Sequence, residues 1–313
     1  MKAFKVLQPG LLSLLHDRGR VGHAALGLTT GGPADPFAAS LANQLVGNGD
    51  DATTLEVSFG GLTVRAQQSL QIAVTGAELP ITINGTEQPQ WTTLNIDEGQ
   101  ELSLGFSEKG CRSYLAVRGG FALDPQFGST STVVREGIGG LSGQKLNAGD
   151  DLQVNPSEEI KGLTLPKASR PTYAQHLTVR VIPGYQQAHF SRLQQRRFFG
   201  SEYEVSPRAD RMGYRLEGSV IDGDITGILS EGIAFGAIQI PADGQPIVLL
   251  NDRQTIGGYP KIGCALTSDC ARLMQLRPGD RVTFTPISPE AAHNAVHLER
   301  IYRRSISLQA RDS

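Results

Sequence analysis

The chain has 313 residues, 39% of them hydrophobic, and its 29 Lys and Arg nearly balance its 31 Asp and Glu, which gives a formal net charge of −2. A single domain usually holds roughly 100–200 residues, so this length favours two domains. The balanced charge argues against a nucleic-acid-binding protein, which normally shows a basic surplus, and against a polybasic membrane contact. The 37 Gly and 17 Pro follow no fixed period and indicate many tight turns between short strands.

The first half of the chain predicts short strands around one helix. The helix is expected over residues 35–47, with Asp35 as N-cap, Pro36 at the first helical position, and Phe37, Leu41 and Leu45 on one face. No clear pattern covers residues 11–21. Asn84-Gly85 predicts a hairpin turn within 81–86. The other expected strands are 3–7, 54–58, 62–66, 70–75, 91–96, 101–106 and 113–118.

The second half begins after a polar stretch between Pro156 and Pro171, which is typical of a linker. Strands are expected at 177–182, 219–221, 234–240 and 246–250, and helices at 186–199, 268–276 with Ser268 as N-cap, and 289–305 with Pro289 in its first turn. We therefore divide the chain into an N-terminal β domain (1–165), a C-terminal β domain (172–287) and a helical tail (288–313).

Three short segments share one pattern, in which a turn with glycine precedes an alternating strand. They are 97–104, 147–154 and 277–284. Glycine permits a positive φ in the turn, and the strand that follows buries every second residue. Such copies recur wherever sheets reverse, so the pattern leaves open whether the two halves share an ancestor.

The N-terminus, the cysteines and the histidines place limits on location and metal binding. The first ten residues lack the apolar stretch of a signal peptide, and no uncharged apolar run reaches roughly 18 residues, so we expect a soluble, cytoplasmic protein. Cys111, Cys264 and Cys270 form no CxxC pair and are expected to be buried free thiols in a reducing compartment. His293 and His297 stand four apart but lack a third ligand, so no metal site is predicted.

Five glycine-rich polar segments are the candidates for chemistry, because no P-loop, nucleophile elbow, HExxH or dinucleotide-binding glycine pattern is present. Glycine pairs let backbone N–H groups approach an anion, and a neighbouring arginine can hold a carboxylate or phosphate with two hydrogen bonds. The alternative is that these are turns whose arginines are tied to neighbouring loops. The segments are 17–20 with 30–36, 118–121, 128–132, 209–218 and 251–260.

The last two segments are richer in polar groups than a turn requires. They contain Asp210, Arg211, Asp252, Thr255 and Tyr259. We therefore place the candidate site there, on the hypothesis that the five segments meet around a common anion-accepting hollow.

In combination and order, these segments resemble the allophanate hydrolase subunit 2 family, also called the biotin-dependent carboxyltransferase family. The resemblance spans roughly residues 5–287. Where the family often has Gly-Pro-Met-Asp, this chain has Gly32-Pro33-Ala34-Asp35, so Ala34 is assigned no contact. The matching blocks are 17–20, 31–36, 41–48, 114–121, 128–129, 210–216, 239–241, 252–260 and 276–280.

The family includes the C subunit of 5-oxoprolinase, the antagonist of the KipI kinase inhibitor, and the carboxyltransferase part of urea amidolyase. The resemblance implies a mainly β fold with two cyclophilin-like β-barrel domains and a few short helices. It also implies two partner chains of the 5-oxoprolinase complex: a KipI-like chain of the B type and a LamB/YcsF-like chain of the A type.

The function that the resemblance favours is that of one component of an ATP-dependent 5-oxoprolinase complex that opens 5-oxo-L-proline to L-glutamate, with ATP bound by the complex. Phosphorylation of the lactam oxygen would expose the carbonyl carbon to water, and this chemistry needs positive groups on the phosphate and donors facing a developing oxyanion. The catalytic hypotheses are Asp210, Arg211 and Asp252. The residues expected to bind substrate or phosphate are Arg18, Arg118, Gly119, Gly120, Thr255, Gly257, Gly258 and Tyr259.

Two other functions stay open. One is carboxyl transfer from carboxybiotin to urea or a related amide, for which biotin would be the cofactor; the chain has no Met-Lys-Met biotin site, so separate chains would have to supply carrier and carboxylase. The other is a non-enzymatic antagonist of a KipI-type histidine kinase inhibitor.

Overall fold

The computed structural model describes residues 1–311 and divides into two compact units. Unit 1 comprises residues 1–21, 31–173 and the described residues from 306 onward, and unit 2 comprises residues 22–30 and 174–305. The main boundary thus lies close to the one expected near residue 172. The division differs from the expected one at residues 22–30, which belong to unit 2, and in the tail, where helix α4 (Pro289–Ser305) belongs to unit 2 and the residues after it to unit 1.

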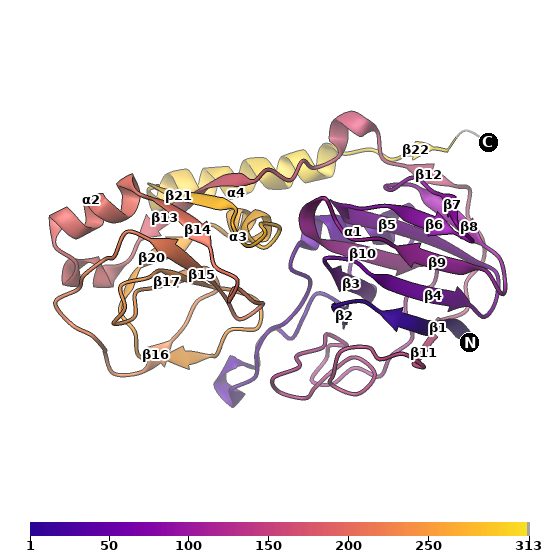
Figure 1. Ribbon diagram of the computed structural model, residues 1–313, viewed down its shortest axis with the longest axis horizontal. Coiled ribbons are helices and arrows are strands. Elements are labelled where there is room, and N and C mark those ends of the chain that lie inside the picture. The colour runs from indigo at the N-terminus through magenta and orange to yellow at the C-terminus, as the bar shows by residue number, and fades with distance from the viewer. Residues whose placement is uncertain (312–313) are drawn as a thin grey trace. The chain divides into compact units, whose positions relative to one another are not determined.

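Unit 1 is built from two antiparallel sheets, drawn in indigo to magenta in Figure 1. The six-stranded sheet has the order β11-β1-β4-β9-β6-β7 and consists of β1 (Lys2–Pro9), β4 (Leu62–Ala66), β6 (Ile81–Ile83), β7 (Thr86–Glu87), β9 (Glu101–Leu104) and β11 (Asp151–Gln153). The five-stranded sheet has the order β2-β3-β10-β5-β8 and consists of β2 (Leu12–His16), β3 (Thr54–Ser58), β5 (Leu70–Glu78), β8 (Thr93–Ile96) and β10 (Lys109–Val117). A large core that includes Phe4, Leu55 and Leu102 draws buried residues from both sheets.

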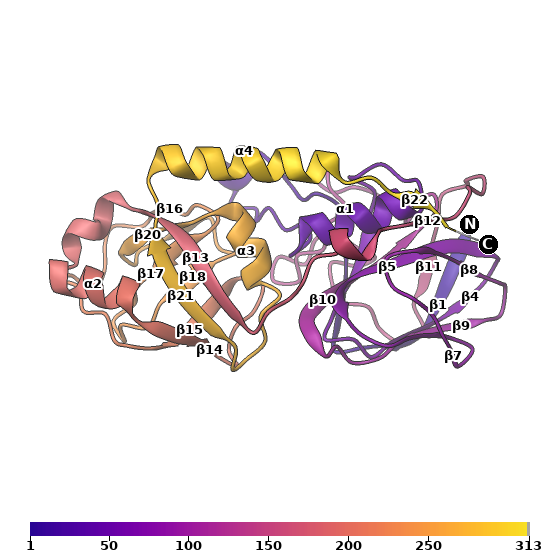
Figure 2. The ribbon, with the colours of Figure 1, turned by 90° about the horizontal axis from the view of Figure 1, so that it is seen from above.

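Helix α1 (Pro36–Leu45) covers the face of the five-stranded sheet at β5 and β10, as Figure 2 shows from above. The expected N-cap is confirmed, since the Asp35 carboxylate accepts a hydrogen bond from the Ala38 N–H at 3.1 Å. Leu41 and Leu45 pack with Trp91 and Tyr114 in a second core cluster. Unit 1 also holds the 3-10 helix η2 (Lys167–Ser169) and a small sheet of β12 (Leu163–Thr164) and β22 (Gln309–Ala310).

Unit 2 is a closed seven-stranded barrel with the order β13-β20-β17-β18-β15-β14-β21, drawn in orange tones in Figure 1. Its strands are β13 (His176–Pro183), β14 (Glu202–Val205), β15 (Gly213–Gly218), β17 (Ala237–Gln239), β18 (Ile247–Leu249), β20 (Lys261–Ala265) and β21 (Arg281–Pro286). A separate two-stranded ribbon pairs β16 (Glu231–Gly232) with β19 (Ile256–Gly257). The helical elements are η1 (Ala24–Leu26), η3 (Tyr185–His189), α2 (Arg192–Gly200), α3 (Thr267–Leu273) and α4.

The expectation of a mainly β fold with a few short helices is confirmed. The hairpin at Asn84-Gly85 is also confirmed, because both residues have positive φ, at 48° and 80°. In the three repeated turns, Gly99, Gly149 and Gly279 have φ between 84° and 95°, and each precedes the strand expected after it.

Four expectations for unit 2 were wrong in detail. The helix expected over 186–199 is two pieces, η3 and α2, because the Ser191 hydroxyl caps a new helix by accepting from Gln194 N–H. Residues 219–221 form no strand, since the Ile221 N–H donates to the Gly244 carbonyl in a loop. The strand expected over 234–240 covers only 237–239. Helix α3 starts at Thr267, so Ser268 is inside it, and both Ser268 and Asp269 accept hydrogen bonds from Arg180.

The cysteines are free thiols, as expected. Cys111 and Cys270 are buried, but Cys264 is partly exposed, which corrects the expectation that all three are buried. Burial raises the pKa of the Cys270 thiol well above its ordinary value. Among residues 1–311 no helix is both long enough and apolar enough to cross a bilayer.

Candidate functional site

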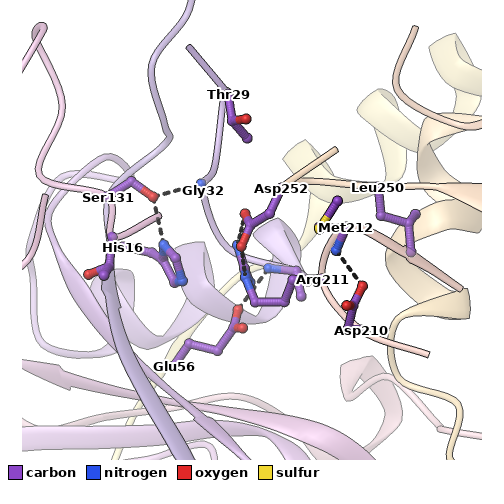
Figure 3. Close-up of polar contacts among 12 residues, drawn as sticks. His16, Thr29, Gly32, Glu56, Ser131, Asp210, Arg211, Met212, Leu250 and Asp252 are labelled. Atoms are coloured by element: carbon purple, nitrogen blue, oxygen red, sulfur yellow. Dashed lines mark hydrogen bonds and ion pairs between the residues drawn. The ribbon is translucent and has the colours of Figure 1, made fainter. Parts of the chain in front are cut away.

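Arg211 and Asp252 form a buried ion pair in unit 2, and the barrel register explains why they meet. Strands β15 and β18 are antiparallel, with Gly213 opposite Leu249, so the chain just before β15 lies beside the chain just after β18. The Arg211 guanidinium donates from Nε to one Asp252 oxygen at 2.9 Å and from Nη2 to the other at 3.0 Å. Figure 3 shows this two-bond contact, which fixes both side chains in one geometry.

Asp210 has a structural role that differs from that of Arg211. Its carboxylate accepts hydrogen bonds from the backbone N–H groups of Met212 at 2.8 Å and Gly213 at 3.1 Å, and the first of these is drawn in Figure 3. An aspartate that caps its own turn in this way holds the backbone in shape. It thereby supports the turn just before β15, from which Arg211 reaches Asp252.

The other predicted site residues of unit 2 lie in the segment that follows Asp252 in the sequence. The Thr255 carbonyl accepts from the Ile233 N–H at 3.0 Å, Gly257 belongs to β19, and the Gly258 carbonyl accepts from the Ile228 N–H at 2.8 Å. Tyr259 is exposed. These residues therefore build the β16–β19 ribbon and the loop beside it.

A cluster around Lys261 was missed by the sequence reasoning. The Lys261 ammonium and the Tyr185 hydroxyl both contact one oxygen of Glu231, and the Gln186 amide donates to the same oxygen at 2.8 Å. The hydrogen bond from Lys261 lowers the pKa of Glu231, and the hydrogen bond to Glu231 raises the pKa of Tyr185. The sequence feature that could have indicated this cluster is Lys261, which directly follows the fifth glycine-rich segment.

The predicted residues of unit 1 have structural partners. Arg18 forms an exposed ion pair with Asp51 at 3.1 Å. The Arg118 guanidinium donates to the carbonyls of Val46, Gly47 and Glu158, so it binds the carboxyl end of α1.

The glycine pair after Arg118 makes a tight turn. Gly119 and Gly120 have φ of 91° and 73°, and a Cβ on Gly119 would lie 2.4 Å from the Asn155 carbonyl oxygen. The Gly119 N–H donates to the Asn48 side chain at 2.9 Å. These contacts match the alternative in which the segments are turns, and a ligand role for Arg18, Arg118, Gly119 and Gly120 stays a prediction.

A buried hydrogen-bond network joins the first glycine-rich segment to the sheet of unit 1. The Ser131 hydroxyl accepts from the Gly32 N–H at 2.7 Å and lies 2.6 Å from His16 Nδ1, as Figure 3 shows. One oxygen of Glu56 accepts from the Tyr114 hydroxyl and from the Ala34 N–H, both at 2.8 Å.

The Tyr114 hydroxyl completes that network. It accepts from the Asp35 N–H at 2.7 Å while it donates to Glu56. Burial, with the charge of Glu56 as the next cause, raises the pKa of Tyr114 well above its ordinary value. The phenol therefore stays protonated and can act as donor and acceptor at once.

No group of three or more His, Cys, Asp and Glu side chains within the described range has a metal-binding arrangement. His293 and His297 are exposed on α4.

Comparison with known proteins places the chain in a family. Residues 26–286 match the model of the carboxyltransferase domain, subdomain A and B. The chain is 37% identical to the C subunit of 5-oxoprolinase from Escherichia coli (strain K12) over 299 residues, which cover 93% of each chain.

Two solved structures are similar in fold and sequence. The crystal structure of TTHA0988 superposes with a TM-score of 0.81 at 34% identity and covers 91% of this chain, which spans 56% of the TTHA0988 chain. The Kluyveromyces lactis urea amidolyase superposes with a TM-score of 0.92 at 26% identity and covers 99% of this chain, which spans only 20% of that enzyme. The resemblance predicted from the glycine-rich segments is thus confirmed, and the chain belongs to the carboxyltransferase domain, subdomain A and B family.

Proposed function

We propose that this chain is one component of an ATP-dependent 5-oxoprolinase complex that opens 5-oxo-L-proline to L-glutamate. The observation that carries the proposal is the match to the C subunit of E. coli 5-oxoprolinase, which spans 93% of both chains. The match to urea amidolyase, in contrast, spans 20% of that enzyme, so most of what the amidolyase needs lies outside the shared part.

In balanced form the reaction consumes one 5-oxoproline, one ATP and two water molecules and yields glutamate, ADP and phosphate. Transfer of the γ-phosphoryl group to the lactam oxygen makes C5 electrophilic, water adds there, the C–N bond breaks, and the nitrogen takes a proton. C–N cleavage leaves an acyl phosphate, and a second water hydrolyses it to the carboxylate of glutamate and free phosphate. The stabilisation required is positive charge on phosphate and hydrogen-bond donors on the developing oxyanion.

Within this proposal, unit 2 supplies the binding and orienting groups of this chain. Arg211 would provide positive charge in a fixed orientation, because Asp252 holds its guanidinium by two bonds. Asp252 would act as base or orient water, and Asp210 would shape the turn that presents them. Thr255 and Tyr259 would contact the substrate from the loop beside the ribbon. ATP would be bound by the complex, with the KipI-like and LamB/YcsF-like chains as partners.

The test is reconstitution with the two partner chains, followed by assays of 5-oxoproline-dependent ATP hydrolysis and of glutamate formation. We expect turnover with all three chains present and none when this chain is omitted. Arg211→Lys and Asp252→Asn complexes, checked for folding by circular dichroism, should lose turnover. Full activity in either variant would contradict the role given to that residue, and no turnover by the wild-type complex would contradict the function.

The second candidate is carboxyl transfer with biotin as cofactor, which the urea amidolyase match favours. In that case a biotinylated protein should co-purify with this chain, and carboxylation of urea should depend on it. A streptavidin blot of the purified complex separates the two candidates. A KipI-type antagonist role would instead show as binding of a partner chain without turnover.

A further inference from the structure

The β16–β19 ribbon covers an outer face of the barrel in unit 2. Ile233, which follows β16, packs with Ala237, Ile247 and Leu249 of strands β17 and β18 in a small apolar cluster. Side chains alternate along a strand, so Gln239 lies on the same face of β17 as Ala237. The ribbon therefore closes over a patch that is apolar except for Gln239.

Gln239 lacks a partner for its amide nitrogen under this cover. The residue is 2% exposed, and its Nε2 has no hydrogen-bond partner within the described chain. A Cβ on Gly257 of the ribbon would lie 3.0 Å from that nitrogen, so the glycine lets the ribbon backbone come close to it. A buried donor without an acceptor costs stability, and its presence in a native fold calls for an explanation.

Lys261 lies beside Gln239 because the two are paired across strands β17 and β20. Paired residues on antiparallel strands present their side chains on the same face. The pairing skips Ile262 just there, which is an irregularity of the kind that re-aims side chains near binding sites. The Lys261 side chain is 12% exposed, and its ammonium is bonded to Glu231 of the ribbon. Glu231 thus fastens the ribbon to the barrel strand that carries Lys261.

We propose that Gln239 and Lys261 form a carboxylate-binding site beneath the β16–β19 ribbon, which opens when Lys261 exchanges Glu231 for the ligand. The groups around it favour an anion. The Lys261 ammonium, the Gln186 amide and the Tyr185 hydroxyl all contact the Glu231 carboxylate, and the Gln239 amide, whose residue is paired with Lys261, can donate as well. A carboxylate would give Gln239 the acceptor it lacks. The assignment rests on the proposed function and deepens it, because 5-oxoproline is a small lactam with one carboxylate.

The experiment uses Gln239→Met, which keeps the volume of the side chain and removes both amide donors. The matched control is Gln245→Met in the same unit, because the Gln245 amide is fully engaged with Gly218, accepting at 2.8 Å and donating at 3.2 Å. In the reconstituted complex, Gln239→Met should raise the KM for 5-oxoproline about tenfold or more, as expected for the loss of roughly one charged hydrogen bond. The KM for ATP should not change, and Gln245→Met should leave both unchanged.

Two further readouts separate binding from structure. 2-Pyrrolidinone, the lactam without the carboxylate, should bind the wild-type and Gln239→Met complexes equally, measured as a competitor of 5-oxoproline. In the free chain, Gln239→Met should keep or raise the melting temperature because it removes an unpartnered donor, while Gln245→Met should lower it. An unchanged KM for 5-oxoproline, or an equal loss of affinity for 2-pyrrolidinone, overturns the carboxylate assignment.

Failure of the function and failure of the site give different results. A wild-type complex that binds 5-oxoproline in equilibrium dialysis without turning it over contradicts the proposed function, and loss of that binding in Gln239→Met still supports the site. Turnover that is indifferent to Gln239→Met contradicts the site and leaves the function standing. A wild-type complex that shows neither turnover nor saturable binding of 5-oxoproline overturns both.

Discussion

The two units use the same kind of sequence segment in different ways. In unit 1 the glycine-rich segments make turns, in which Arg118 donates to three carbonyl groups and Arg18 forms an exposed ion pair with Asp51. In unit 2 the corresponding arginine, Arg211, is paired with a side chain, Asp252, and the nearby ribbon covers Gln239, whose amide nitrogen has no partner among residues 1–311. The contacts of the glycine-rich segments in unit 1 are those that a turn requires. In unit 2 the buried polar groups are more than a turn requires.

This difference matters because a backbone contact and a side-chain contact have different consequences. A guanidinium that binds carbonyl groups holds a helix end, and its removal is expected to affect folding first. Burying a guanidinium and a carboxylate together costs desolvation free energy, and hydrophobic residues in their place would give similar or better stability. Unit 1 has a buried pair of its own, Arg112 with Glu56, but it lies outside the glycine-rich segments. We therefore infer that the glycine-rich segments of unit 2 carry more of the chain's ligand chemistry than those of unit 1, and four predictions test this contrast.

The largest effect is expected from breaking the buried pair of unit 2. Asp252→Ala leaves Arg211 buried with its strongest partner removed, which should destabilise the unit by about 3–5 kcal/mol. The measurement is urea denaturation followed by far-ultraviolet circular dichroism. Glu204→Ala, which breaks the exposed pair with Arg281 in the same barrel, is the control and should cost at most about 1 kcal/mol. If the two variants lost equal amounts of unfolding free energy, the buried pair would contribute no more to stability than the exposed pair, which contradicts this prediction.

In unit 1, Tyr114→Phe should cost about 1–3 kcal/mol, since it takes an acceptor from the Asp35 N–H and a donor from Glu56, both buried. The same urea denaturation assay measures this loss of unfolding free energy. Tyr302→Phe on the exposed face of α4 is the matched control and should change little. Ligand binding by the complex should survive Tyr114→Phe if the network is structural, and a selective loss of substrate affinity in a folded variant would contradict that view.

A smaller effect is expected at the N-cap of α1. Asp35→Ala removes the acceptor of the Ala38 N–H and should cost about 1 kcal/mol. Asp35→Asn keeps an acceptor at that position and should cost less than the alanine variant. If the two variants melt at the same temperature, the contribution of Asp35 comes from another contact, such as the hydrogen bond that Tyr173 donates to its carboxylate.

Local sequence patterns predicted the fold well and the site only in part. Asp35, Asn84-Gly85 and the three repeated glycine turns were identified because caps and positive φ depend on a few adjacent residues. The start of α3 was misplaced because Arg180, far away in the chain, contacts both Ser268 and Asp269. Long-range partners of this kind leave no trace in a local pattern.

The same limit applies to the site. Asp210, Arg211 and Asp252 were selected by residue type, and the sequence could not tell that one caps a turn while the other two pair with each other. The cluster of Tyr185, Glu231 and Lys261 was missed because its members come from η3, β16 and β20. Gln239 was within a matching block, but its unpartnered nitrogen is a property of the packed ribbon and not of the sequence.

The smallest effect concerns the contact that fastens the ribbon, Glu231 with Lys261. The pKa of Glu231 is lowered in the folded chain, mainly by the hydrogen bond from Lys261, so its contribution to stability is present above the ordinary carboxyl pKa of 4.5 and is lost as the pH falls through the folded value. Glu231→Gln should therefore lower the melting temperature slightly near neutral pH, by less than Asp35→Ala, because the contact is partly exposed. The difference from wild type should shrink below pH 4.5 and disappear once Glu231 is protonated in the folded state. A difference that stays constant across this range would show that the charge of Glu231 does not hold the ribbon, and the exchange of Glu231 for a ligand carboxylate would then lose its physical basis.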